Sequence, residues 1–406
     1  MTDTTSHDQR QITRGSAAEV LAAFLKLGLT SFGGPIAHLG YFRDELVLRR
    51  KWIDEKGYAD LVALSQFLPG PASSQVGFAL GLLRGGPLGA FAAWAAFTLP
   101  SAILLTLFAL GAAAFGGPVG SGIITGLKIV AVAIVAQAVW GMAKNLCPDR
   151  ERATIALGAV LIVVLLAGSL GQVAAIAAGA AAGLLFCRNH HEAITSHINF
   201  PVSRTFGAIS LALFFALLFG LPIVATATSS QGLAVFDSFY RAGSLVFGGG
   251  HVVLPLLETE VVRSGWVSHD QFLAGYGAAQ AVPGPLFTFA AYLGTLLGPA
   301  PNGLIGASIA LVAIFLPGFL ILLGVIPFWD SFRKRDSAQA LMRGANAAVV
   351  GILGAALYDP VFTSAIVGPR QFALALSCFV LLMAWKAAPW IVVLIAAAGG
   401  VLIGAT

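Results

Sequence analysis

Long apolar stretches without a charged side chain alternate with short charged segments along this chain. Five such stretches span residues 85–127, 153–187, 205–236, 271–329 and 387–406. A helix needs about 20 apolar residues to cross the hydrocarbon core of a bilayer, so several of these stretches hold one or two crossings. Helices satisfy their own backbone polar groups, which lipid cannot do. The pattern therefore predicts an all-α integral membrane protein that crosses the bilayer several times.

Composition agrees with a membrane location and excludes several other classes. Hydrophobic residues make up 58% of the 406 residues and charged residues only 10%, whereas soluble domains carry about 25% charged residues. The net charge of +5 comes from short basic clusters between apolar stretches, which indicates contact with the lipid bilayer and no nucleic-acid partner. The three cysteines are isolated, and no nucleotide-binding or hydrolase motif is present. We therefore expect no metal, no cofactor and no enzyme activity.

The chain carries one pattern twice. Residues Phe24–Glu45 align with Phe239–Glu260, and the shared residues include a pair of glycines. Farther along, a Trp, a Gln and a Pro-Gly-Pro unit recur in the same order in both halves. Such an internal repeat points to two copies of one structural unit. We assign the first repeat to residues 1–200 and the second to residues 201–406.

Opposite charge distributions predict that the two repeats are inserted in opposite orientations. Between Tyr41 and Tyr58 the first repeat has five basic residues. The equivalent segment, 256–272, has one arginine and three acidic residues. Because basic loops stay in the cytoplasm, the first segment is expected to face the cytoplasm and the second to face out. Inverted repeats with a substrate site at their interface are a common plan for transporters.

Two kinds of break interrupt the apolar segments of each half. One is a Gly-Gly pair, at Phe32-Gly33-Gly34-Pro35 and at Phe247-Gly248-Gly249-Gly250. The other is a Pro-Gly-Pro unit, called here the first unit (residues 69–71) and the second unit (residues 283–285). Proline ends one helix and suits the first turn of the next. The predicted half-helices span residues 58–68, 71–83, 268–282 and 285–298.

These breaks predict a substrate site for an anion. Half-helix N-termini offer free N–H groups and the positive end of the helix dipole. Hydroxyl groups that follow each Pro-Gly-Pro unit add donors, and a glutamine precedes each unit at the same distance. The alternative is that the breaks are ordinary kinks in membrane helices. The candidate substrate-binding residues at the breaks are Gly33, Gly34, Gln66, Pro69, Gly70, Pro71, Ser73, Ser74, Gly248, Gly249, Gln280, Pro283, Gly284, Pro285 and Thr288.

Two cations complete the candidate site. Lys26 and Arg241 occupy equivalent positions, shortly before the two Gly-Gly pairs. A charged residue inside an apolar segment is costly and therefore points to function. The alternative is that both side chains extend to the membrane interface, where their charges stay in water. His251 follows the second Gly-Gly pair and is either a proton carrier or a structural residue.

Together these motifs resemble the chromate ion transporter family, in its long-chain form with two domains. The resemblance rests on segments 32–35 and 66–71 in the first half and on segments 247–251 and 280–285 in the second. It implies a secondary transporter that exports chromate across the bacterial cytoplasmic membrane and confers chromate resistance. The glycines and prolines of the family motifs correspond to the Gly-Gly pairs and Pro-Gly-Pro units of this chain. Gly250 departs from the first half, where a proline follows the Gly-Gly pair.

Three alternatives remain open at this stage. Sulfate, which has the same shape and charge as chromate, is an alternative substrate for a transporter on this scaffold. A passive anion channel would have the same architecture. A membrane-embedded enzyme that acts on a lipid is a further alternative, but its helices would carry clustered acids, histidines or a nucleophile. The sequence also leaves proton coupling and a homodimer open.

Overall fold

The fold is described from a computed structural model, which covers residues 15–112, 117–166, 168–188, 200–247, 250–329 and 335–404. All regular structure in these ranges is helical, without a strand. Six of their helical segments are long and apolar enough to cross a membrane. The prediction of an all-α, multi-pass membrane protein is therefore confirmed. The six segments span Ala72–Gly111, Gly117–Leu146, Ser169–Phe186, Arg204–Thr228, Gly303–Phe328 and Asp336–Ala365.

Polar residues cap the starts of two short helices in the first half, and a glycine interrupts its longest helix. Ser16 caps the first helix by accepting the Glu19 N–H, and Asp54 caps α3 by accepting the Gly57 N–H. The long helix α4 is interrupted at Gly86, whose φ of 65° and ψ of −159° are not helical. The elements are α1 (Ala17–Thr30), α2 (Gly34–Phe42), a π-helix (Arg43–Arg49), α3 (Glu55–Phe67), α4 (Ala72–Ala112), α5 (Gly117–Leu146), α6 (Arg150–Leu165) and α7 (Ser169–Phe186).

The second half begins with an additional helix, α8, and then repeats this order from α9 onward. Two 3-10 turns, Gly250–Val252 and Leu286–Thr288, lie at positions where the first half has regular helix. The helices are α8 (Arg204–Thr228), α9 (Gln231–Ser244), α10 (Val253–Leu257), a π-helix (Glu258–Val262), α11 (His269–Ala279), α12 (Phe289–Leu296), α13 (Gly303–Val325), α15 (Asp336–Ala356), α16 (Thr363–Ala365), α17 (Pro369–Met383) and α18 (Pro389–Gly404).

Residues that the sequence repeat aligns lie in corresponding elements. Helices α1 and α9 are each followed by a Gly-Gly segment, a short helix and a π-helix. Helices α3 and α11 come next, and each ends just before a Pro-Gly-Pro unit. The equivalence extends to the turn after each π-helix, where the Trp52 N–H donates to the Leu46 carbonyl and the Trp266 N–H to the Val261 carbonyl. The two halves therefore share local structure as well as sequence.

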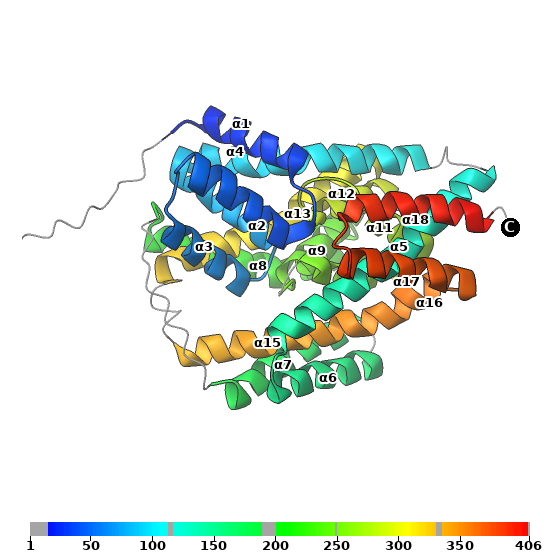
Figure 1. Cartoon of the computed structure of the whole chain (residues 1–406). Helices are drawn as coiled ribbons and strands as arrows, with labels where there is room; N and C mark the ends of the chain where they lie inside the picture. The colour runs from blue at the N-terminus through cyan, green and yellow to red at the C-terminus, as the bar shows by residue number, and fades with distance from the viewer. Residues whose placement is uncertain are drawn as a thin grey trace, which may run out of the picture.

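The broken segments lie between two groups of longer helices (Figure 1). Helices α1 and α4 pack together on one side of the molecule, and α6, α7 and α15 pack together on the other. Helix α5 packs on α17 and α18, while α13 packs on α8, α9 and α12. One core of buried apolar side chains joins α5 to the elements of the second half. A second core lies under α1 to α4 and includes Leu322 of α13 and also Ile326 and Trp329, which follow that helix. The breaks are therefore held in the interior by both halves.

Candidate functional site

Both Pro-Gly-Pro units separate two helices. Helix α3 ends at Phe67, before the first unit, and α4 begins at Ala72, after it. In the same way, α11 ends at Ala279 and the next helical turn begins at Leu286. The central glycines, Gly70 and Gly284, have φ values of 117° and 95°, a region that L side chains rarely adopt. The predicted breaks are therefore present at both units.

Each Pro-Gly-Pro unit is bound by the backbone of the other half. The Gly70 N–H donates to the Val246 carbonyl at 2.7 Å, and the Gly284 N–H donates to the Ser31 carbonyl at 2.8 Å. Ser31 and Val246 are themselves equivalent in the repeat, since each comes just before a Phe-Gly-Gly segment. These two bonds form a reciprocal pair that joins the four breaks into one region.

Space around the two central glycines is too small for another carbon atom. A Cβ on Gly70 would lie 2.9 Å from Gly318 Cα and 3.0 Å from Gln75 Nε2. A Cβ on Gly284 would lie 2.7 Å from Ser101 Oγ and 3.1 Å from the Phe97 carbonyl oxygen. Each unit therefore lies directly against a long helix of the opposite half, α13 for the first unit and α4 for the second.

The two Gly-Gly segments also approach each other. Gly33 and Gly34 have φ values of 99° and 80°, and α2 begins at Gly34. A Cβ on Gly250 would be 3.3 Å from Pro35 Cγ, and one on Gly34 would be 3.9 Å from His251 Nε2. The predicted site residues Gly248 and Gly249 lie outside the described residues.

The predicted hydroxyl residues are buried at the starts of the helices that follow the units. The Ser73 Oγ lies 3.3 Å from Nδ1 of His38, a fully buried residue that the sequence analysis did not select. The Thr288 hydroxyl donates to the Pro285 carbonyl at 2.8 Å. The Ser74 hydroxyl is buried and has no hydrogen-bond partner within the described ranges. Ser74 and Thr288 therefore differ in what they can offer a ligand.

The two predicted glutamines differ in their surroundings. Gln66 is exposed, whereas Gln280 is half-buried and its Nε2 has no hydrogen-bond partner among the described residues. A third glutamine, Gln75, forms a hydrogen bond with the first unit itself. The buried Gln75 donates through Nε2 to the Pro69 carbonyl and to the Gly318 carbonyl, both at 2.9 Å. Gln75 thereby joins the first unit to α13. The sequence offers its amide as a possible donor after the first unit, but the repeat does not mark it, because Phe289 occupies the equivalent position.

Lys26 and Arg241 are engaged in equivalent ion pairs. Lys26 Nζ lies 2.8 Å from Glu45, on the first π-helix, and Arg241 lies 3.3 Å from Glu260, on the second. Glu45 and Glu260 are aligned in the repeat, so both the cation and its acidic partner recur. Arg241 also contacts Asp237 at 2.6 Å. Each cation therefore joins the helix before a Gly-Gly segment to the π-helix after it.

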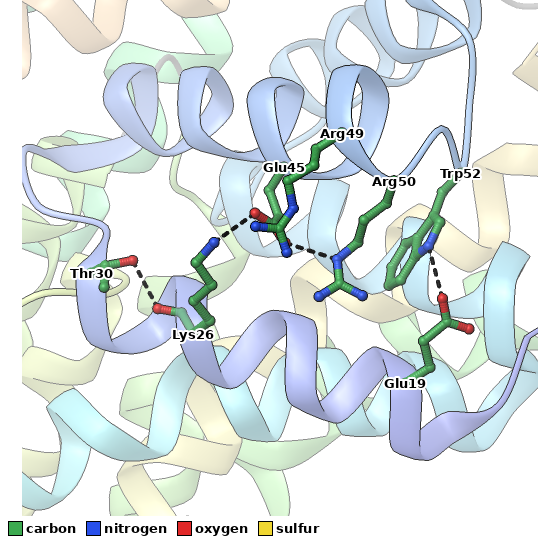
Figure 2. Close-up of polar contacts among 7 residues, drawn as sticks. All are labelled: Glu19, Lys26, Thr30, Glu45, Arg49, Arg50 and Trp52. Carbon is green, nitrogen blue, oxygen red and sulfur yellow. Dashed lines mark hydrogen bonds and ion pairs between the residues drawn. The ribbon is translucent and has the colours of Figure 1, made fainter.

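Figure 2 shows that Glu45 lies at the centre of a basic cluster. Its carboxylate contacts Lys26, Arg49 at 2.9 Å and Arg50 at 2.8 Å. Burial by itself raises the pKa of Glu45, but its hydrogen bonds to Lys26 and Arg50 outweigh burial and hold the pKa below its usual value. Glu45 is therefore ionised at neutral pH, and the cluster keeps more positive than negative charge.

A second set of contacts extends this cluster along the same face. The Trp52 indole N–H donates to Glu19 at 3.2 Å, and Glu19 also accepts from Arg84 at 3.0 Å. The guanidinium groups of Arg50 and Arg84 lie 5.8 Å and 5.5 Å from the centre of the Trp52 ring, within cation–π range. The repeated tryptophan thus ties α1 to the turn before α3.

The groups at the breaks are mostly hydrogen-bond donors and acceptors. The described residues contain no group of three His, Cys, Asp or Glu side chains that could hold a metal ion. A groove between α6 and α7 is lined by Ile155, Ala159 and Gly179 among others, and none of its lining residues belongs to the breaks. The breaks instead bring together backbone N–H groups, hydroxyls and amides, with ion pairs nearby. These groups are suited to holding a small anion.

The chain is similar to a known family of transporters. The profile of the family described as Chromate transporter matches the chain twice, over residues 18–184 and 233–401. The chromate transport protein of Pseudomonas aeruginosa is 31% identical over 399 residues, which cover 95% of this chain and 91% of the relative. The probable chromate transport protein of Synechococcus elongatus is 28% identical over 366 residues, 84% of each chain.

A further relative extends the comparison beyond bacteria. An uncharacterized transporter of Methanocaldococcus jannaschii is 29% identical over 343 residues, which cover 83% of each chain. No solved structure matches the chain. Since the family profile covers most of both halves, the chain belongs to the chromate transporter family.

Proposed function

We propose that this protein is a secondary transporter that exports chromate from the bacterial cytoplasm across the inner membrane and so confers chromate resistance. The observation that carries the proposal is the reciprocal pair of hydrogen bonds between the two halves, from Gly70 to Val246 and from Gly284 to Ser31. A site shared by two repeats can open to either side when the repeats move relative to each other. The names of the Pseudomonas and Synechococcus relatives support chromate as the substrate.

The break residues are suited to a tetrahedral dianion. Chromate presents oxygen acceptors in all directions, and the breaks present donors from helix N-termini, hydroxyls and Gln280. Neutral donors bind an anion less tightly than a bare cation does, which favours release during transport. In this proposal the substrate-binding set consists of the Gly-Gly pairs, both Pro-Gly-Pro units, Ser73, Ser74, Gln280 and Thr288. Gln66, which the sequence also predicts, is left out because its side chain is exposed. Lys26 and Arg241 serve the site through their ion pairs.

Export of a dianion needs no ATP in a cell whose interior is negative. Moving one charge through 100 mV is worth about 2.3 kcal/mol, so a dianion gains roughly 4.6 kcal/mol. Since about 1.4 kcal/mol corresponds to a factor of ten, the potential alone could hold a gradient of roughly a thousandfold. Coupling to protons would add to this gradient.

The distribution of charge supports the outward direction. Three cations surround Glu45 in the first half, whereas two acids surround Arg241 in the second. The positive end of a membrane protein stays in the cytoplasm. A positive cluster at that end would raise the local concentration of an anion where export begins.

Chromate accumulation in intact cells tests the proposal. Cells that express the protein should accumulate less chromate than cells with an empty vector, and they should survive higher chromate concentrations. Equal accumulation, with the protein verified in the membrane, contradicts export. Growth on limiting sulfate is the second readout, because improved growth would make sulfate uptake the function instead.

A further inference from the structure

Four buried hydroxyls of the first half have no hydrogen-bond partner within the described part of the chain. They belong to Ser31, Ser65, Ser74 and Thr98, whose exposed fractions are 0%, 0%, 2% and 0%. Ser65 lies within α3, whereas the other three lie next to a break or in the turn of α4 that contacts one. A buried hydroxyl without a partner is costly, so natural proteins rarely keep one without a reason. In helices the usual solution is a bond to the carbonyl one turn earlier, which Ser244 and Thr295 make here.

Ser31 and Thr98 lie beside the second Pro-Gly-Pro unit, and Ser74 lies at the start of α4. The Ser31 carbonyl accepts the Gly284 N–H, and Gly284 lies against the turn of α4 that contains Thr98, between Phe97 and Ser101. Ser74 lies in the first turn of α4, where N–H groups have no acceptor within the helix.

His38 connects the two places where these hydroxyl residues lie. Its ring is 5.3 Å from the ring of Phe97, which precedes Thr98, and its Nδ1 is 3.3 Å from the hydroxyl of Ser73, which precedes Ser74. The residues that precede two of the unpartnered hydroxyls, Thr98 and Ser74, therefore meet at His38.

The second half is apolar at the equivalent positions. Val246 aligns with Ser31, Val253 with His38, and Phe315 with Thr98. These three apolar residues are as deeply buried as their polar counterparts, with exposed fractions of 0%, 0% and 1%. The repeat thus forms its local fold without polar side chains at these positions, so folding does not require the polar residues of the first half.

Ser74 and its counterpart in the second half differ in their hydrogen bonds. Thr288 aligns with Ser74 and keeps a hydroxyl, but that hydroxyl is already bonded to the Pro285 carbonyl. Only the first half therefore leaves its hydroxyl at this position without an internal partner, among the residues that the structure describes.

We infer that the transported oxyanion binds on the first-half side of the repeat interface, with the hydroxyls of Ser31, Ser74 and Thr98 as ligands, whereas Val246 and Phe315, which align with Ser31 and Thr98, offer it no donor. This inference rests on the proposed function and assigns its substrate to one side of the repeat interface. Neutral hydroxyl donors arranged around a helix start suit a tetrahedral oxyanion such as chromate or sulfate. Ser31 and Thr98 are new ligands, because the motifs of the sequence do not include them.

Transport kinetics in everted membrane vesicles test the assignment. Ser31→Ala and Thr98→Val each remove one hydroxyl, and each should raise the KM for chromate and the inhibition constant for sulfate about tenfold, with a smaller change in maximal rate. The matched control is Thr295→Val, a buried threonine whose hydroxyl is bonded within α12. Its KM should stay within twofold of the wild type. Unchanged KM values in both test variants overturn the inference.

A second pair of variants guards against a folding defect. Ser31→Thr and Thr98→Ser keep the hydroxyl and should keep the wild-type KM, whereas an equal loss in these variants would assign the effect to packing and overturn the inference. Binding is also measurable without transport, as the rise in melting temperature that sulfate causes in purified protein. Wild type should show this rise and Thr98→Val should not. An equal rise in melting temperature in wild type and Thr98→Val would contradict the hydroxyl site, whether or not flux is detected. Absence of chromate flux, with the sulfate effect as expected, would contradict only the proposed function.

Discussion

At the scale of single residues, the repeated glycines have a physical explanation. Gly70 and Gly284 both adopt positive φ values, donate their N–H groups to the opposite half and face a helix without space for a side chain. Glycine alone meets all three conditions at little cost. The two residues therefore set the distance at which the two halves meet.

Replacing either glycine by alanine should damage the interface. In Gly284→Ala the new Cβ would overlap Ser101 and the Phe97 carbonyl, and the overlap and strained φ together cost roughly 2–5 kcal/mol. We expect lower thermal stability in detergent and lower chromate flux. The control is Gly265→Ala, which has a similarly positive φ of 74° but no atom within 4 Å of the new Cβ. Equal behaviour of the two variants would contradict a role for close contact.

Because Lys26 is held in an ion pair, its replacement should affect stability and leave chromate binding nearly unchanged. A direct substrate ligand would show the opposite effect. Glu45→Gln should destabilise the protein more than Lys26→Gln, because Glu45 takes part in three ion pairs and Lys26 takes part in one of them. Neither change should alter the KM for chromate by more than about threefold. A large rise in KM with unchanged stability in Lys26→Gln would restore Lys26 as a substrate ligand.

The same pair has a defined dependence on pH. The pKa of Glu45 is lowered in the folded protein, so its stabilising contribution is present above the unfolded value of about 4.3 and is lost as the pH falls through the folded value. Melting temperatures of wild type and Glu45→Gln should therefore differ from pH 7 down to pH 5 and converge in stronger acid. A difference that grew on acidification would contradict this assignment.

At the scale of elements, the sequence predicts where helices break better than it predicts what holds the breaks. Prolines and paired glycines act through local backbone geometry, so both Pro-Gly-Pro units could be located from sequence alone. The ends of the half-helices shift by a few residues, because α4 continues to Gly86 instead of ending at residue 83. Contacts such as Gln75 to Gly318 join residues far apart in the chain, and no local pattern contains them.

Gln75 provides a test of how the first unit is held. Gln75→Leu keeps the approximate volume but removes two donors, which leaves the Pro69 and Gly318 carbonyls without this partner. The expected cost is about 1–3 kcal/mol, since the buried acceptors lose their hydrogen bonds. The melting temperature in detergent should fall accordingly. Gln66→Leu is the matched control, because Gln66 is exposed and should tolerate the change.

At the scale of the whole molecule, two similar halves have become chemically different. Their helix order, their cation–glutamate pairs and their crossed hydrogen bonds correspond. Their charge and buried polarity do not, since the first half carries the basic cluster and the unpartnered hydroxyls. The repeat and its cations were visible in the sequence. The acidic partners were visible too, as the aligned Glu45 and Glu260, but only the structure shows which charges meet.

The opposite orientation of the two repeats remains a prediction that labelling can test. In a cysteine-free background, Lys56→Cys and Ser264→Cys place single thiols at exposed positions in corresponding segments of the two halves. A membrane-impermeant thiol reagent should label position 264 in intact cells and position 56 only in everted vesicles. Labelling of both positions from the same side would contradict inverted repeats.

Chromate uptake by everted vesicles under an imposed membrane potential tests the central claim most directly. Vesicles with an interior-positive potential should accumulate chromate against its gradient when they contain the protein, and excess sulfate should reduce this uptake. Collapse of the potential should abolish the accumulation unless a proton gradient replaces it. Chromate that equilibrates without exceeding the outside concentration would indicate a channel. No uptake under any gradient, with the protein shown to be inserted and folded, would contradict the claim that it is an oxyanion exporter.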